Sequence, residues 1–362
     1  MNKEKIKILI IDDSRAVQRM LEFIIAQSED LEVIGAASDA YEAVEIMREV
    51  KPNVIILDVR MPRMDGLTFL KKLMSQHPIP VIVFSSLITK NPEIGVKALE
   101  YGAVDVIDKP IIDYKNMTTT LMQEARLLKV IRTVGRSKLS TKNTSFERNA
   151  VSRMAISSVA TSSTDVVICI GASAGGTQAV KHLLARLPDN LPPILIVQHM
   201  PVEFTGQYAR YLNDVCSMTV TEAIDGEKLQ SGHAYVAPGD QHLTAEKHGA
   251  GYRVKLLGGE KVSGHKPSVD VLFRSAANVI KSRAIGVILT GMGKDGAAGL
   301  LEMKGANSYT IAQDESSCVV FGMPMEAIKL GAVDQVCSLD DIPQAMISLL
   351  NKMKNINHQP TT

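Results

Sequence analysis

The first third of the chain alternates short apolar runs with segments whose apolar residues recur at helical spacing. One such segment is AYEAVEIMREV, over residues 40–50. The apolar runs that separate these segments cover residues 7–11, 32–37, 53–58, 80–85 and 104–108. Repeated strand-helix units predict a parallel sheet with helices on both faces. We therefore predict an α/β domain over residues 5–123, built on a five-stranded parallel sheet.

The hydrophobic period disappears after about Val134, in a stretch rich in Ser, Thr, Lys and Arg, and residues 124–163 are predicted to form a linker. A second α/β domain is predicted over residues 164–352, followed by a polar tail over residues 353–362. Its apolar runs, which predict parallel strands, cover residues 166–171, 194–199, 284–291 and 309–314. Residues 242–259 alternate around a glycine-containing turn and predict an antiparallel hairpin. The expected fold is doubly wound and mainly parallel.

Length and composition narrow the class of protein. A chain of 362 residues exceeds one hydrophobic core, which agrees with two domains. A net charge of +1 provides no general attraction to nucleic acid or to an anionic membrane. The sequence contains no run of about 18 uncharged apolar residues, so no membrane span is predicted. Carboxylates follow the first short apolar run directly, which argues against a secretory signal. The four cysteines lack metal-ligand spacing and read as reduced thiols, so we predict a cytoplasmic protein.

Polar residues gather where the predicted strands of the first domain end. They are Asp12, Asp13, Asp58, Ser85 and Lys109. Ligand sites of parallel sheets form at this carboxyl edge. Two carboxylates suit Mg²⁺, the serine and lysine suit phosphoryl oxygens, and the remaining aspartate would be a nucleophile that accepts a phosphoryl group. Any one acid at a strand end is more simply a helix cap or a solvated turn, but five such residues on one edge favour a site.

These residues, together with LDVRMPRMDG and DKP, resemble the receiver domain of two-component response regulators over residues 5–125. The resemblance implies a flavodoxin-like fold, a histidine kinase as phosphodonor and Mg²⁺ as cofactor. It implies that Asp58 accepts the phosphoryl group and that Asp12, Asp13, Asp58 and the backbone carbonyl of Arg60 bind the metal. It also gives Lys109 and Ser85 the phosphoryl-binding and switch roles. Val106 departs from the aromatic switch residue that receivers often carry three positions before the lysine.

The stretch GASAGG, residues 171–176, joins a predicted strand to a predicted helix. A dinucleotide fingerprint would need glycine at the position of Ser173 and an acid at the end of the next strand, which ends in Gln198 and His199. Both requirements fail. A G-x-S-x-G elbow would instead present Ser173 as a nucleophile, beside the N–H groups of a helix N-terminus that suit an oxyanion.

A serine nucleophile needs a base and an orienting acid. Of the eight histidines, His199 ends the neighbouring predicted strand, and His265, in GHKPSVD, is its rival. Asp295 lies in the loop after the strand over residues 284–291, where it would orient the base or simply cap a helix. The predicted triad is Ser173, His199 and Asp295, an order that differs from that of α/β-hydrolases.

Five motifs then resemble the catalytic domain of the chemotaxis protein-glutamate methylesterases over residues 164–350. They are GASAGG, VQHMP, HKPSVDVLF, LTGMGKDGAAG and IAQDESSCVVFGMP. The resemblance implies Ser173 as nucleophile, His199 as base, Asp295 as orienting acid, and the backbone N–H of Met292 as oxyanion donor, with no cofactor in this domain. Ala174 stands where many members have Thr. A receiver followed by this domain is that family's arrangement.

The implied function is a phosphorylation-activated serine esterase that acts in sensory adaptation. Its substrates would be glutamate methyl esters, and certain glutamines, on methyl-accepting chemotaxis receptors, with no nucleic-acid partner and no direct membrane insertion. A DNA-binding output domain is the alternative, but it needs a helix-turn-helix and a basic face, whereas the second half offers strands and no Lys/Arg cluster. A non-catalytic output module that keeps the fold is a further alternative.

Overall fold

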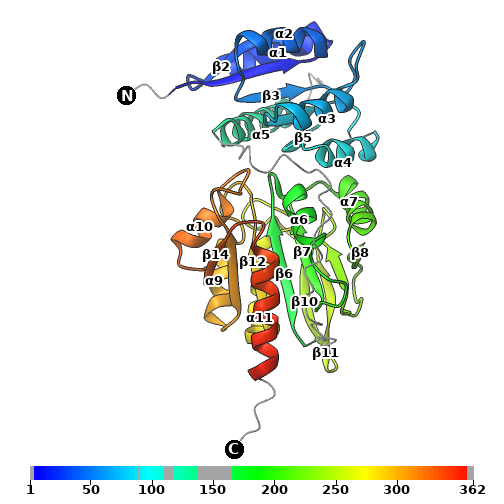
Figure 1. The fold of residues 1–362 in the computed structure, drawn as a ribbon, viewed down its shortest axis with the longest axis vertical. Coiled ribbons are helices and arrows are strands. Elements are labelled where there is room, and N and C mark those ends of the chain that lie inside the picture. Colours follow the sequence, from blue (N-terminus) through cyan, green and yellow to red (C-terminus); the bar gives the residue numbers. More distant parts are fainter. Residues whose placement is uncertain (1–3, 89, 110–116, 137–164, 357–362) are drawn as a thin grey trace, which may run out of the picture. The chain divides into compact units, whose positions relative to one another are not determined.

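The computed structural model describes residues 4–88, 90–109, 117–136 and 165–356, which divide between two compact units, Met1–Ser145 and Phe146–Thr362 (Figure 1). Each unit contains its own sheet. Within the described ranges, no helix has the length and apolar character needed to cross a bilayer. The two predicted α/β folds are therefore described one at a time.

The first unit contains a parallel sheet of five strands in the order β2-β1-β3-β4-β5. The strands are β1 (Ile6–Ile11), β2 (Leu31–Ala37), β3 (Val54–Leu57), β4 (Val81–Phe84) and β5 (Asp105–Ile107). All residues of β3 and β4 are buried, as expected for strands covered on both faces. The predicted five-stranded, flavodoxin-like sheet is confirmed.

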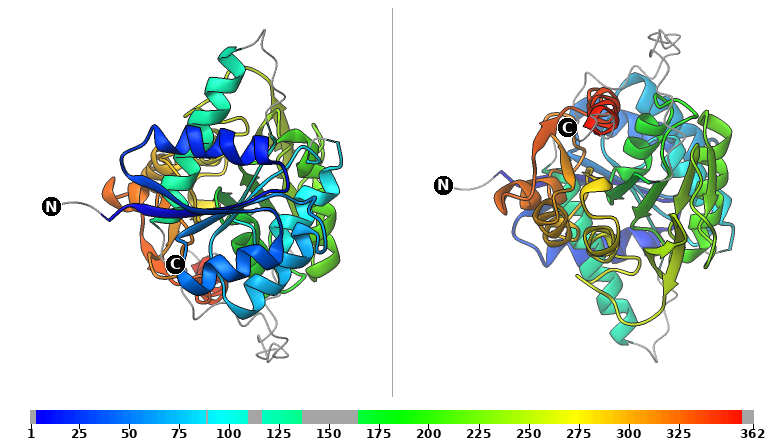
Figure 2. Two further views of the ribbon diagram at one scale, coloured as in Figure 1. Left: turned by 90° about the horizontal axis from the view of Figure 1, so that it is seen from above. Right: turned by 90° about the horizontal axis from the view of Figure 1, so that it is seen from below.

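Helices cover both faces of this sheet (Figure 2). They are α1 (Arg15–Ala26), α2 (Ala40–Glu49), α3 (Gly66–Gln76), α4 (Pro92–Glu100) and α5 (Met117–Gly135). Short polar side chains begin three of them: Ser14, Asp39 and Asp65 each accept a hydrogen bond from the first turn of the helix that follows. These caps fix where each helix starts relative to the strand before it.

Helix α5 corrects the predicted domain boundary. The linker was expected to begin at residue 124, but the helix continues to Gly135. The side chains of Leu127, Val130, Ile131 and Val134 are buried, at the three- and four-residue spacing of a helix face that packs on a core. The boundary at residue 123 is therefore wrong, because this part of the expected linker belongs to the first unit. Residues 137–163 of that linker lie outside the described part of the chain.

The second unit is built on a seven-stranded parallel sheet in the order β14-β13-β12-β6-β7-β9-β8. The strands are β6 (Val167–Ala172), β7 (Ile194–Gln198), β8 (Thr219–Glu222), β9 (His233–Val236), β12 (Ala284–Ile288), β13 (Tyr309–Gln313) and β14 (Gln335–Cys337). The four predicted strands are β6, β7, β12 and β13, which occupy the centre of the sheet. The other three were missed, because they are short and partly exposed.

Helices pack on both faces of this sheet, and the sheet separates two hydrophobic cores, one on each face. They are α6 (Gly176–Leu184), α7 (Val202–Val215), α8 (Val269–Val279), α9 (Ala297–Gly305), α10 (Met323–Lys329) and α11 (Ile342–Ile356), with a 3₁₀ turn at Lys281–Arg283. The predicted hairpin is confirmed as a separate antiparallel pair, β10 (His242–His248) and β11 (Gly251–Leu257). The predicted polar tail starts too early, because α11 continues to Ile356; residues 357–362 lie outside the described part.

Candidate active site and phosphorylation site

The turn between β6 and α6 holds Ser173 at the carboxyl edge of the second sheet. The backbone N–H of Ser173 donates to the carbonyl of Thr290 (3.0 Å), and the Gln198 side-chain amide donates to the carbonyl of Ser173 (2.9 Å). Gly175 has a φ of 74°, and a Cβ at this position would lie 2.6 Å from the Val319 side chain. Only glycine fits this turn without strain. Ser173 is half-buried directly before the helix N-terminus, where a nucleophile must be reachable.

His199 follows β7, the strand next to β6, and its backbone N–H donates to the carbonyl of Ala172 (3.1 Å). Its side chain is only 8% exposed, and its Nε2 lies 2.8 Å from Asp295 Oδ2. Because an ionised carboxylate only accepts, the proton of a neutral His199 ring lies on Nε2. Nδ1 is then the basic nitrogen. It is buried, and among the described residues it has no hydrogen-bond partner.

The Asp295 carboxylate is buried and accepts four hydrogen bonds. Oδ2 accepts from His199 Nε2 (2.8 Å) and from the Val269 N–H (2.8 Å); Oδ1 accepts from Ser268 Oγ (2.7 Å) and from the Asp270 N–H (3.1 Å). Burial alone would raise the pKa of this carboxyl group. The hydrogen bond and the charge of His199, together with the hydrogen bonds from Ser268 and Val269, outweigh burial and hold the pKa below its usual value. Asp295 is therefore ionised at neutral pH.

Asp295 does not cap the helix that follows it, because the N-cap of α9 is Gly296. Its carboxylate instead meets the N-terminus of α8, where free N–H groups and the helix dipole favour a negative charge. The structure therefore excludes Asp295 as the cap of α9, and its role as the orienting acid stays a prediction. The N–H groups of α8 and the Ser268 hydroxyl were missed, although a serine before an apolar helix was a usable signal.

The three residues of the predicted triad come from the carboxyl ends of three neighbouring strands, β12, β6 and β7. The loop after β12 packs directly on the nucleophile turn. Thr290 Oγ1 donates to the carbonyl of Ala174 (3.0 Å), and a Cβ on Gly291 would lie 2.8 Å from Ser173 Cβ. The structure thus brings these loops to one edge, as expected for ligand sites of open parallel sheets. Met292 lies in the same loop, and its role as oxyanion donor stays a prediction.

The rival histidine also lies at this edge. The ring of His265 stacks on the ring of His199, with 3.8 Å between centroids and an interplanar angle of 4°. The hydrogen bond of His199 to Asp295 favours His199 as the base, since its ring is oriented by a carboxylate. The sequence offers the two histidines as alternatives and does not predict that they are in contact.

In the first unit, Asp12, Asp58, Ser85 and Lys109 follow β1, β3, β4 and β5, which are neighbours in the sheet. Lys109 Nζ lies 2.6 Å from Asp12 Oδ2 and 2.7 Å from Asp58 Oδ2. A Cβ on Gly66 would lie only 2.0 Å from the carbonyl oxygen of Asp58, so α3 packs closely under this loop. The structure therefore brings together Asp58, the predicted nucleophile, with Lys109 and Asp12.

The same edge offers ligands for a cation. One carboxylate oxygen each of Asp12, Asp13 and Asp58 lies within 4.8 Å of the others. Burial raises the pKa of Asp12, against the opposing hydrogen bond and charge of Lys109. A divalent cation would favour the ionised form, and oxygen donors suit Mg²⁺. The residues therefore fit the predicted metal. The Arg60 carbonyl as a further ligand stays a prediction.

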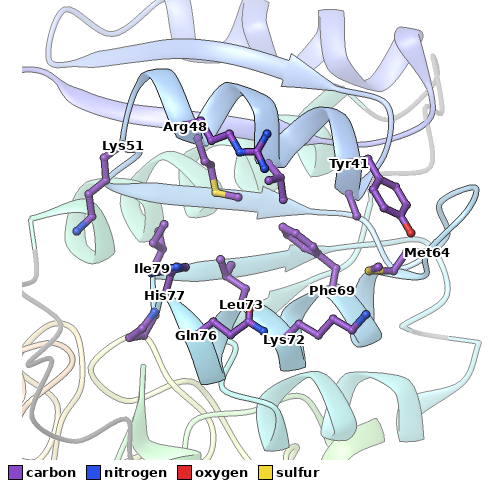
Figure 3. Close-up of a pocket in the computed structure, with 14 residues that line it drawn as sticks. Tyr41, Arg48, Lys51, Met64, Phe69, Lys72, Leu73, Gln76, His77 and Ile79 are labelled. Atoms are coloured by element: carbon purple, nitrogen blue, oxygen red, sulfur yellow. The ribbon is translucent and has the colours of Figure 1, made fainter.

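A groove between α2 and α3 is separate from this cluster (Figure 3). Its apolar lining includes Phe69, Leu73 and Ile79, and cationic side chains lie along it, among them Arg48, Lys51 and Lys72. None of Asp12, Asp58 and Lys109 lines the groove. The groove therefore shares none of these three residues with the predicted phosphorylation site.

A flavodoxin-like unit with a carboxylate-lysine cluster, and an α/β unit with serine, histidine and aspartate at one sheet edge, define the class of receiver-linked serine hydrolases. Residues 8–122 match the family of response regulator receiver domains, and residues 168–346 match the CheB methylesterase family. Both matches lie within the two described units and confirm the two resemblances found in the motifs.

Curated relatives match almost the whole chain. A protein-glutamate methylesterase/protein-glutamine glutaminase of group 3 operon from Rhodopseudomonas palustris is 45% identical over 355 residues, which cover 96% of this chain and 97% of the relative. A protein-glutamate methylesterase/protein-glutamine glutaminase from Methylobacillus flagellatus is 47% identical over 349 residues, covering 95% and 97%. The CheB methylesterase catalytic domain of Thermotoga maritima matches with a TM-score of 0.50 and 40% identity, covering 51% of this chain and 98% of that domain. The chain belongs to the protein-glutamate methylesterase/protein-glutamine glutaminase family.

Proposed function

We propose that this chain is a cytoplasmic, phosphorylation-activated serine esterase that demethylates glutamate methyl esters, and deamidates specific glutamines, on methyl-accepting chemotaxis receptors. The observation that carries the proposal is the His199–Asp295 pair at the sheet edge beside Ser173. Membership of the methylesterase family supports the substrate class. The result of the reaction would be sensory adaptation.

Acylation begins when Ser173 Oγ attacks the side-chain carbonyl carbon of the substrate and His199 Nδ1 takes the hydroxyl proton. Asp295 stabilises the resulting imidazolium through Nε2. The Met292 N–H and the N-terminus of α6 stabilise the tetrahedral oxyanion. The carbon–oxygen bond to the methoxy group then breaks, and His199 returns its proton to release methanol. With a glutamine substrate, the leaving group is ammonia.

Deacylation repeats these steps with water. His199 Nδ1 takes a proton from water as its oxygen attacks the acyl carbon, and the bond to Ser173 Oγ breaks as the serine regains a proton. One ester and one water become a glutamate side chain and methanol. In this scheme His199 moves every proton in both half-reactions.

In the first unit, Asp58 accepts a phosphoryl group from a chemotaxis histidine kinase. Asp12, Asp13, Asp58 and the Arg60 carbonyl would hold Mg²⁺, which supplies charge neutralisation when bound. Lys109 and Ser85 bind the phosphoryl oxygens, so Lys109 leaves its present ion pairs. The added charge shifts a two-state equilibrium of the receiver that raises esterase activity; a shift of about 1–3 kcal/mol gives roughly 5–150-fold activation.

The test is methanol release from methylated receptor membranes by the full-length chain, with and without a small phosphodonor. We expect the phosphodonor to raise the rate, and we expect Asp58→Ala to keep the basal rate without this response. Ser173→Ala should fall below about 1% of the wild-type rate, because loss of a triad nucleophile costs roughly 10⁴-fold or more. A wild-type chain that releases no methanol would refute the esterase proposal.

The alternative of a DNA-binding output domain finds no support in the second unit. Its described residues form a seven-stranded parallel sheet, and it matches the methylesterase family. A non-catalytic module would bind receptors without releasing methanol, and the Ser173→Ala comparison separates it from an esterase.

A further inference from the structure

We propose that His265 is a positioning residue that holds the imidazole plane of His199 in the orientation needed for proton transfer from Ser173. The inference rests on the esterase function proposed above. Its starting observation is the parallel stack of the two rings, 3.8 Å apart with 4° between their planes. Stacked aromatic rings attract each other beyond the area that they bury.

A tight turn fixes the backbone of His265. The N–H of Val262 donates to the carbonyl of His265 (3.0 Å), and the N–H of His265 donates to the carbonyl of Val262 (2.9 Å). The two residues between them, Ser263 and Gly264, have φ values of 53° and 83°. Two central residues with positive φ are typical of a type I′ turn, whose geometry leaves little freedom to its ends. His265 therefore has a defined place, although it lies in a loop.

The turn is hydrogen-bonded to α8, the helix whose N-terminus donates to Asp295. Ser263 Oγ donates to Asp270 Oδ2 (2.7 Å), and Asp270 Oδ1 accepts from the N–H of Gly299 (2.8 Å). Asp270 is buried in the first turn of α8, and its own N–H donates to Asp295. One segment thus contacts the base by a ring stack and the orienting acid by hydrogen bonds.

The two contacts restrain different motions of His199. The hydrogen bond from Nε2 to Asp295 holds one ring atom, but rotation about the Cβ–Cγ bond can still tilt the ring plane and change the direction of Nδ1. A parallel ring on one face opposes this rotation. Proton transfer needs Nδ1 within hydrogen-bond reach of the serine hydroxyl, so loss of the stack lowers the fraction of competent enzyme.

The test compares His265→Ala, which removes the ring, with His265→Phe, which keeps an aromatic ring of similar shape. His248→Ala is the matched control, because His248 is exposed at the end of β10. Two readouts use the full-length chain: kcat and KM for methanol release from methylated receptor membranes, and the rate at which a fluorophosphonate probe labels Ser173. Circular dichroism and thermal unfolding report whether each variant keeps the fold.

We expect His265→Ala to lower kcat and the labelling rate about 3- to 10-fold with KM unchanged, His265→Phe to restore both to within about twofold, and His248→Ala to match the wild type. A folded His265→Ala with wild-type rates would overturn the inference. So would a Phe variant as slow as His199→Ala, because His265 would then act as the base. If the wild type labels at Ser173 but releases no methanol, the proposed substrate fails, and the labelling rates still decide the role of His265.

Discussion

Replacing Asp295 with Asn tests the orienting carboxylate most directly, because the two side chains have almost the same shape. The carboxylate accepts hydrogen bonds from four donors, two on each oxygen. An amide keeps one oxygen and places an NH₂ group at the other position. If the NH₂ group replaces Oδ1, the Ser268 hydroxyl can accept its hydrogen bond; if it replaces Oδ2, the His199 ring can. The backbone N–H beside the NH₂ group, that of Asp270 or Val269 respectively, can only donate and therefore loses its acceptor.

The structure therefore predicts the loss of one buried hydrogen bond together with a negative charge at the end of α8. An unsatisfied buried N–H costs about 1–3 kcal/mol, which lowers the Tm of a unit of this size by about 2–12 °C. The effect on catalysis should be much larger. Without the carboxylate, His199 loses both the control of its tautomer and the charge that stabilises its imidazolium. Such a change costs about 10⁴-fold in kcat in a comparable triad.

The assay measures kcat for methanol release and the thermal unfolding curve of the same preparation. Asp225→Asn is the matched control, because this exposed aspartate also accepts a backbone hydrogen bond, from Leu256, in a loop. A folded Asp295→Asn enzyme that retains more than about a tenth of the wild-type kcat would show that Asp295 does not orient the base.

Three further outcomes follow from the geometry. The pKa of Asp295 is lowered in the folded protein, so its ionised form stabilises the fold fully above the ordinary carboxyl pKa of about 4, and this stabilisation is lost as pH falls through the lower folded value. In denaturant titrations, the difference in unfolding free energy between wild type and Asp295→Asn should therefore shrink from pH 7 to pH 3. Mg²⁺ should raise the Tm of the receiver transition in the full chain, and Asp12→Asn should abolish the rise, as scanning calorimetry would show. A fragment of residues 1–123 should stay unfolded by circular dichroism while one of residues 1–136 folds, since each of the four buried side chains lost from α5 is worth about 1.5–3 kcal/mol; a folded shorter fragment would contradict this reasoning.

The central strands could be predicted because they are long apolar runs that are buried on both faces. β8, β9 and β14 could not, since three or four residues with polar ends show no period that differs from that of a loop. The end of α5 was missed for a related reason. Charged residues such as Arg126, Lys129 and Arg132 alternate with its buried face, so the segment reads as a polar linker unless the helical spacing of its apolar residues is traced.

The candidate triad was predictable because parallel strands deliver their carboxyl ends to one edge, whatever their distance along the chain. What surrounds the triad was not. The contact between His265 and His199 depends on a two-residue turn, and the four donors to Asp295 depend on where α8 begins. Both are set by loop conformations between the hairpin and α8, which the hydrophobic pattern does not specify.

The position of β6 at the centre of the second sheet also orders events during synthesis. One neighbour, β7, follows it closely in the chain, but the other, β12, is made much later: the bond from Thr290 to Ala174 spans 116 positions, and the bond between His199 and Asp295 spans 96. Pairing of such distant segments is slow, because a long loop must close before any contact forms. A growing chain therefore exposes its serine well before the carboxylate exists. The candidate site therefore stays incomplete during synthesis, until the last third of the chain leaves the ribosome and β12 pairs with β6.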